Sequence, residues 1–134
     1  MARTLERQFI QERAYSILKN AYGSGAQFHP GQLDAIVSVV SGRDSLVVEK
    51  TGWGKSLVYF VSTKILRENG AGPTLIISPL LALMENQVES ARIFGVDAVT
   101  VSSDNKDQWD DIYRNLNRGL IAISNARICA GDAE

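Results

Sequence analysis

An eight-residue run at positions 49–56, Glu-Lys-Thr-Gly-Trp-Gly-Lys-Ser, constrains the fold of this chain more than any other segment. It stands between residues 45–48, Ser-Leu-Val-Val, which we expect to form a strand, and a long apolar stretch typical of a helix. Gly52 and Gly54 allow the backbone to turn tightly and to present its N–H groups inward. A strand, a glycine-rich loop and a helix in this order predict a phosphate-binding site.

The side chains of this loop indicate how a nucleotide would be held. The Lys55 ammonium would reach the β- and γ-phosphates, and the Ser56 hydroxyl would be a Mg²⁺ ligand. Trp53 occupies a variable position, where we expect a partly exposed aromatic lid. The general pattern for such loops begins with glycine, but Glu49 stands at that position. An ordinary glycine-rich turn is the alternative interpretation.

The composition suits one packed core and shows no strong charge bias. The 134 residues include 14 basic and 15 acidic side chains, which gives a formal net charge of −1. A contact with nucleic acid would therefore depend on a local groove, because no overall positive field attracts it. The single cysteine, Cys129, excludes an internal disulfide and fits a reducing compartment.

No segment of the sequence indicates export or membrane insertion. Residues 1–7 mix acidic and basic side chains and lack the apolar core of a signal peptide. No apolar run approaches the roughly 20 residues that a membrane-spanning helix needs. We therefore expect no membrane partner and a cytoplasmic protein, associated with the nucleoid if it is bacterial.

The order of apolar patterns predicts an α/β fold with a parallel sheet. Two helices, over residues 5–21 and from Gly31 to about residue 41, precede the loop. Strands are then expected at residues 46–48, 74–77, 98–101 and 120–123, with helices at 55–68, 80–94 and 107–118 between them. The strand runs are almost continuously apolar, which predicts a sheet covered by helices on both faces.

A short segment before the loop, Phe28-His-Pro-Gly-Gln32, offers a group that recognises adenine. A glutamine carboxamide can accept a hydrogen bond from the adenine amino group and donate one to the neighbouring ring nitrogen. Gln32 in this role would select ATP over GTP, with Pro30 and Gly31 fixing the turn that presents it. Taken alone, the segment also fits an ordinary helix start.

A second strand-to-helix junction follows the loop, at Ser78-Pro79 within residues 74–88. Such a junction exposes backbone N–H groups and a hydroxyl at the edge of the sheet where open α/β folds bind ligands. Ser78, Asn86 and Gln87 are therefore candidates for contacts with a nucleic-acid phosphate. The alternative is a serine-capped helix whose apolar residues only pack on the sheet.

These three segments together resemble RecQ-like helicases of superfamily 2. Residues 28–32 resemble the adenine-reading motif of that family, 51–56 its motif I and 78–88 its motif Ia. The resemblance implies an incomplete RecA-like P-loop domain over residues 25–134, preceded by a helical segment at 1–24. It further implies an ATP- and Mg²⁺-dependent motor that moves 3′ to 5′ on single-stranded or partly duplex DNA. The implied nucleotide-binding residues are Gln32, Thr51, Gly52, Trp53, Gly54, Lys55 and Ser56, of which Lys55 and Ser56 act on phosphate and magnesium.

The sequence departs from the family in several places. His29 stands where the family usually has arginine, and Glu49 is not the family's commonest residue. No Asp-Glu-x-His motif occurs, and residues 124–127, Ser-Asn-Ala-Arg, replace a typical Ser-Pro-Glu-Arg stretch. We therefore expect a truncated first motor lobe with negligible ATPase activity by itself, to be completed by a second lobe or a partner chain.

Two other functions remain open from the sequence. A catalytically inactive remnant, or a module that binds nucleotide or DNA, would have the same motifs without turnover. Another P-loop enzyme, such as a small-molecule kinase, is the third hypothesis. The helices before the loop and the Gln32 segment argue against a compact kinase that opens with its loop.

Overall fold

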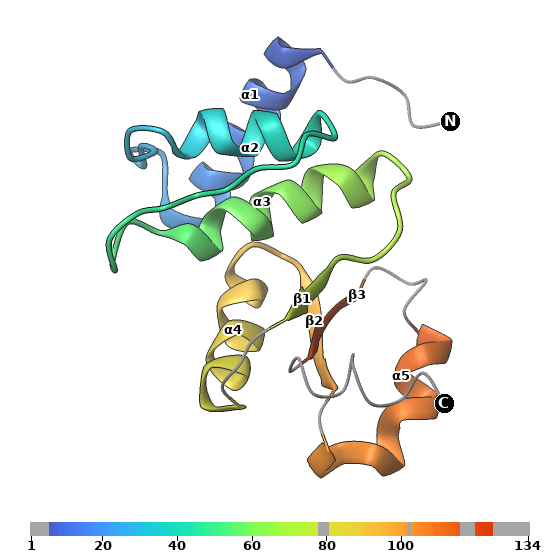
Figure 1. Ribbon diagram of the computed structural model, residues 1–134. Helices are drawn as coiled ribbons and strands as arrows, with labels where there is room; N and C mark the ends of the chain where they lie inside the picture. Colours follow the sequence, from blue (N-terminus) through green and yellow to red (C-terminus); the bar gives the residue numbers. More distant parts are fainter. Residues whose placement is uncertain (1–5, 78–80, 102, 116–119, 125–134) are drawn as a thin grey trace. The chain divides into compact units, whose positions relative to one another are not determined.

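The structure, a computed structural model, describes residues 6–77, 81–101, 103–115 and 120–124 (Figure 1). Contacts between Cα atoms divide the chain into two compact units, Met1–Ala71 and Gly72–Glu134. The division into segments 1–24 and 25–134 that the sequence suggests stays a prediction.

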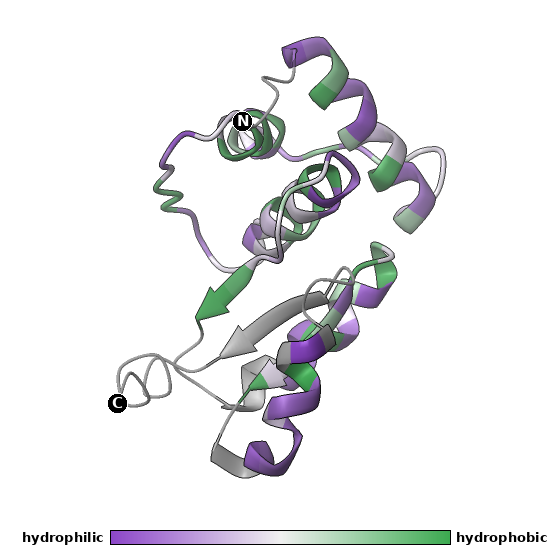
Figure 2. Cartoon of the chain, turned by 90° about the vertical axis from the view of Figure 1, so that its right-hand side faces the viewer, coloured by the Kyte–Doolittle hydropathy of each residue, from purple (hydrophilic) through white to green (hydrophobic). Residues whose placement is uncertain are grey.

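The described part of the first unit consists of three helices: α1 (Arg7–Tyr22), α2 (Gln32–Val40) and α3 (Lys55–Glu68). The three helices predicted for this region are confirmed, and α3 has the predicted bounds. Helix α1 packs against both α2 and α3. Hydrophobic and hydrophilic segments both occur along the helices of the chain (Figure 2). The apolar faces form a core with fully buried side chains that include Ile10, Leu18, Ile36, Phe60 and Ile65.

Two ion pairs join α1 to the other helices. The Arg13 guanidinium donates to both carboxylate oxygens of Glu68 on α3, at 2.8 and 2.5 Å. This hydrogen bonding holds the pKa of Glu68 below its usual value and raises the pKa of Arg13. Arg7 contacts Asp34 on α2 at 2.7 Å, but both side chains are well exposed to solvent. The Arg13–Glu68 pair is therefore the more protected contact.

The prediction of a strand at residues 46–48 is wrong. These residues form no regular element, and the Leu46 and Val48 side chains are 90% and 81% exposed. The first unit has only helices among its described elements, so the run has no strand beside it with which to pair. A β-strand needs such a partner for its N–H and C=O groups, whatever the apolarity of its side chains.

The second unit contains a parallel sheet of three strands: β1 (Leu75–Ile77), β2 (Asp97–Val101) and β3 (Leu120–Ser124). Their order is β1-β3-β2, and β3 pairs in parallel with both neighbours. Helix α4 (Leu81–Ile93) packs against β2, and α5 (Trp109–Asn115) lies on the other side of the strands in Figure 1. The burial on both faces that the sequence predicts for the strands is contradicted at β1, where Leu75 and Ile77 are 57% and 54% exposed.

The helix predicted at residues 107–118 begins differently. A 3-10 segment, η1 (Ser103–Gln108), precedes α5, and Asn105 within it has non-helical angles of φ −125° and ψ 35°. The Asn105 amide donates to the Thr100 carbonyl of β2 at 2.6 Å, and its oxygen accepts from the Trp109 indole at 3.2 Å. These side-chain bonds favour a bent start over a continuous helix. Residues 116–119 lie outside the described part.

Among the residues that the structure describes, no helix is both long enough and apolar enough to cross a membrane.

Candidate functional site

The glycine-rich loop turns through two glycines with left-handed backbone angles. Gly52 has φ 91°, and Gly54, directly before α3, has φ 92° and ψ 48°. Side chains with a Cβ atom rarely adopt such angles, which explains why glycine occupies both positions. The loop therefore has the tight bend that its sequence predicts, and it leads directly into the first turn of α3 at Lys55.

Two successive peptide groups of the loop are held by one buried side chain. The Gln32 amide nitrogen donates to the main-chain carbonyls of Trp53 and Gly54, at 2.7 and 3.3 Å. In a planar trans peptide the following N–H points opposite to the carbonyl. The N–H groups of Gly54 and Lys55 are therefore directed away from Gln32. Consecutive N–H groups around a left-handed residue form a concave anion-binding nest.

Gln32 itself is almost fully enclosed, with 1% of its surface exposed. Its carboxamide oxygen accepts the His29 N–H at 2.7 Å, so that both ends of the carboxamide bond to the chain. The contact to Gly54 is close, because a Cβ atom on that glycine would lie 2.5 Å from the Gln32 nitrogen. The sequence predicts a glutamine near the nucleotide but not its position beneath the loop. To read adenine, this carboxamide would have to release the loop carbonyls.

Trp53 joins the loop to the turn before α2. Its indole N–H donates to the Pro30 carbonyl at 3.1 Å. The ring also lies beside Gly31, where an added Cβ atom would be 3.6 Å from the indole. The expected partly exposed aromatic residue is thus present, with a defined hydrogen-bond partner that the sequence did not indicate.

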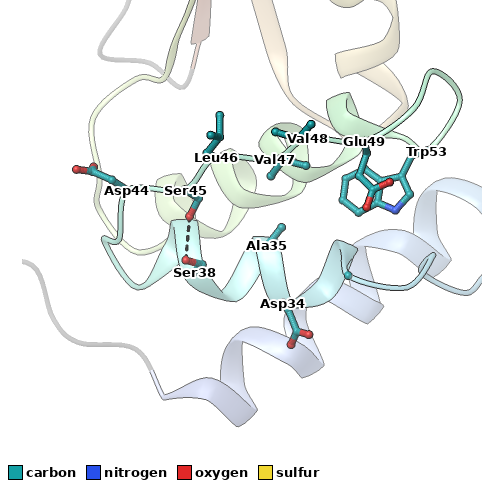
Figure 3. A pocket seen from close by; sticks show the side chains of 11 residues that line it. Asp34, Ala35, Ser38, Asp44, Ser45, Leu46, Val47, Val48, Glu49 and Trp53 are labelled. Atoms are coloured by element: carbon teal, nitrogen blue, oxygen red, sulfur yellow. Dashed lines mark hydrogen bonds between the residues drawn. The ribbon is translucent and has the colours of Figure 1, made fainter.

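Trp53 also lines a pocket of about 590 Å³ between α2 and the segment at residues 44–49 (Figure 3). Ser38 on α2 and Ser45 in the segment form a 2.8 Å hydrogen bond across it. Acidic and apolar side chains share the remaining wall, namely Asp34, Ala35, Asp44, Leu46, Val47, Val48 and Glu49. Asp34 is ion-paired with Arg7, but Asp44 and Glu49 add negative charge to the wall. This charge disfavours a phosphate in the pocket, so the predicted phosphate position is the nest.

Lys55 and Ser56 lie next to each other in the first turn of α3, as predicted. The Lys55 side chain is exposed, and its ammonium is 3.4 Å from the Lys50 carbonyl. Ser56 hydrogen-bonds to Tyr59 one turn further along the helix. Burial raises the pKa of the Tyr59 phenol, and the bond from Ser56 partly opposes this rise. Tyr59 was not predicted, although its spacing of three residues from Ser56 is the signal that could have identified it.

No protein cage for a cation exists in the part of the chain that the structure describes. None of its His, Cys, Asp and Glu side chains gather in groups of three or more that could hold a metal ion. A Mg²⁺ ion at the loop would therefore rely on the Ser56 hydroxyl, phosphate oxygens and water. Magnesium commonly binds nucleotides in this way, with few protein ligands.

The candidates for nucleic-acid contact belong to the second unit. Asn86 is exposed and Gln87 half-buried, and both lie on α4. The Asn86 carbonyl accepts the Ser90 hydroxyl at 2.9 Å, which leaves its side chain out of that contact. Ser78 lies outside the described residues. The structure thus brings Gln32, Trp53, Gly54, Lys55 and Ser56 together, whereas Asn86 and Gln87 are part of a separate unit.

The sequence of the chain is similar to those of known helicases. The sequence profile of DEAD/DEAH box helicases matches residues 29–129. The ATP-dependent DNA helicase RecQ of Haemophilus influenzae is 35% identical over 111 residues, which are 82% of this chain and 17% of that protein. ATP-dependent helicase wrn-1 of Caenorhabditis elegans is 31% identical over 80% of this chain and 10% of its own length. ATP-dependent helicase SGS1 of Saccharomyces cerevisiae is 33% identical over 78% of this chain and 8% of its own length. The chain therefore spans less than a fifth of each of these relatives.

Proposed function

The chain belongs to the DEAD/DEAH box helicase family and is similar to its RecQ-type helicases, and on this premise we propose that it is the ATP-binding segment of an ATP-dependent DNA helicase. One observation supports this most directly. The Gln32 amide holds the carbonyls of Trp53 and Gly54, so that two neighbouring N–H groups face away from it together. A triphosphate would bind these N–H groups, with Lys55 beside its outer phosphates.

Magnesium would bind next to the same phosphates. In this proposal Ser56 exchanges its hydrogen bond with Tyr59 for a place in the coordination shell of Mg²⁺. The other ligands are phosphate oxygens and water, which suits an ion that dehydrates reluctantly.

Adenine would be read by Gln32 in an exchange of hydrogen bonds. When ATP binds, the carboxamide gives up the two loop carbonyls and pairs with the amino group and ring nitrogen of the base. The loop no longer needs Gln32 at that point, because phosphate itself orders the N–H groups. A guanine base presents a different pattern of donors and acceptors at this edge, so GTP would bind less well.

Isothermal titration calorimetry with Mg-ATP tests the phosphate site. We expect Lys55→Ala to weaken binding by about 1.5–3 kcal/mol, the scale of a hydrogen bond to a charged group. Lys50→Ala is the matched control, because it removes the other lysine of the same loop. Equal affinities for Lys55→Ala and the unmodified protein would contradict the proposal.

A second titration tests the role of Gln32 in base selection. Gln32→Ala is expected to reduce the preference for ATP over GTP, since the base-reading group is gone. If ATP and GTP lose affinity by the same factor, Gln32 acts only by holding the loop, and the adenine-reading role is refuted.

Single-stranded DNA is the proposed nucleic-acid ligand, with Asn86 and Gln87 as contacts to its backbone. Replacement of Asn86 by alanine should weaken binding of a labelled oligonucleotide by about 0.5–1.5 kcal/mol, the value of one hydrogen bond. Anisotropy of the label reports this, and Asn20→Ala on α1 is the control. An Asn86→Ala protein with unchanged affinity would remove this contact from the proposal.

For the intact helicase we propose translocation from 3′ to 5′, with a second lobe or a partner chain completing the ATPase site. Unwinding of a duplex with a 3′ tail, compared with one with a 5′ tail, tests the polarity. Preference for the 5′ tail would contradict it.

A further inference from the structure

Trp53 is bound to the turn before α2 and to the first residue of α2 by two independent contacts. Its indole N–H donates to the Pro30 carbonyl at 3.1 Å, and its own carbonyl accepts the Gln32 amide at 2.7 Å. The turn is closed in addition by the bond from the His29 N–H to the Gln32 oxygen. The loop and the turn are thus connected through one side chain from each segment, over a separation of more than 20 residues.

The two contacts respond differently when a base is bound. The Gln32 contact uses the carboxamide that the proposed function assigns to adenine, so it is lost in the ATP complex. The indole contact involves only Trp53 and the Pro30 carbonyl, neither of which would hydrogen-bond to the base in the proposed complex. It can therefore persist in the complex, where it would still join the turn to the loop directly.

From this difference we propose that Trp53 is a positioning residue, whose indole keeps the base-reading turn aligned with the phosphate loop while ATP is bound. The inference depends on the proposed function, because it assumes that ATP contacts both segments. A site whose parts are aligned beforehand loses less conformational entropy on binding and therefore binds more tightly. Trp53 would act through Pro30 and Gln32, without itself contacting the reacting phosphates.

The test compares two ligands that use different parts of the site. Mg-ATP requires both the turn and the loop, whereas Mg-tripolyphosphate requires the loop alone. With tripolyphosphate Gln32 keeps its bonds to the loop carbonyls, so the indole bond adds little. Calorimetry should show that Trp53→Phe weakens the binding of Mg-ATP about 5-fold, as expected for the loss of one neutral hydrogen bond. Its affinity for Mg-tripolyphosphate should stay within about 2-fold of the unmodified protein.

Trp109→Phe is the matched control. Its indole also donates one hydrogen bond, to Asn105 at 3.2 Å, and its side chain is also half-buried, but it belongs to the second unit. We expect Trp109→Phe to bind both ligands normally. A Trp53→Phe protein with normal ATP affinity, or with equal losses for both ligands, would overturn the positioning role. An unmodified protein that binds neither ligand, or a Lys55→Ala protein that binds both normally, would instead refute the proposed function.

Discussion

The two units of this chain hold their backbone in different ways. In the second unit, backbone groups hold one another, because β3 pairs along its length with β1 and β2. In the first unit, the loop has an internal backbone bond from the Trp53 N–H to the Lys50 carbonyl, at 3.3 Å. Side chains tie it to the rest of the unit, since the Gln32 amide donates to two loop carbonyls and the Trp53 indole donates to the Pro30 carbonyl. A ladder tolerates changes of side chain, whereas a side-chain clamp depends on particular residues. The loop should therefore be far more sensitive to conservative substitutions than the sheet.

Two short apolar runs, one paired with a strand and one not, also differ between the units. Residues 46–48 and the β1 residues Leu75–Ile77 are each three residues long, and both precede a helix. Only the second run forms a strand, in register with β3 from Leu75 opposite Ala122 to Ile77 opposite Ser124. The available partner, and not the apolar composition, decides between them.

A pair of proline substitutions gives the largest expected effect and tests this contrast. Ala122 lies in the central strand, where each N–H faces a neighbouring strand, so Ala122→Pro removes a ladder bond. We expect it to lower the free energy of unfolding by about 3–5 kcal/mol, at the upper end for single substitutions. Val47→Pro, in the unpaired run, should change it by no more than about 0.5 kcal/mol. Urea unfolding followed by circular dichroism measures both. A similar loss for Val47→Pro would show that this run is paired in solution.

The two loop glycines give an intermediate effect and sharpen the comparison. Both have left-handed angles, but a Cβ atom meets nothing within 4 Å at Gly52, whereas at Gly54 it meets the Gln32 nitrogen at 2.5 Å. Gly52→Ala should cost about 1–2 kcal/mol from backbone strain alone. Gly54→Ala should cost about 2–4 kcal/mol, because it also displaces Gln32 from the loop carbonyls. The same urea experiment applies. Equal costs would mean that Gln32 does not hold the loop.

The smallest effect concerns the ion pair between Arg13 and Glu68. Arg13 lowers the pKa of Glu68 in the folded protein, so the pair stabilises the fold above the unfolded-state pKa. This contribution is lost as the pH falls through the lowered value. At neutral pH Glu68→Gln should cost about 0.5–1 kcal/mol, since the pair is partly solvent-screened.

The difference between Glu68→Gln and the unmodified protein should therefore shrink as the pH is lowered from about 6 to about 3. Unfolding free energies over this range provide the measurement, and Glu89→Gln on α4 is the control. A difference that stays constant with pH would contradict the assigned role of this carboxylate.

Much of the fold follows from local patterns in the sequence. The bounds of α3 were predictable because Gly54 precedes Lys55 and an Asn-Gly pair follows Glu68, which are strong signals for a helix start and end. The strands of the second unit were predictable from their apolar runs. The bent start before α5 was not, because it depends on the Asn105 side chain reaching the Thr100 carbonyl.

The site was predictable only in part, because some of its contacts also join segments that are distant in the sequence. The loop glycines and the place of Lys55 and Ser56 follow from their sequence order. The burial of Gln32 and the bond from Trp53 to Pro30 depend on two segments meeting after the chain has folded. No local pattern encodes which carbonyl a distant side chain will reach, so these contacts had to come from the structure.

The placement of the two indoles has a practical consequence. Trp53 and Trp109 are the only tryptophans, and each unit contains one. Replacing either with phenylalanine leaves a single tryptophan, in a known unit of the chain, whose emission can be excited apart from that of the tyrosines. Emission spectra of the two variants would then reveal, without any attached dye, whether the halves melt in one cooperative step or in sequence.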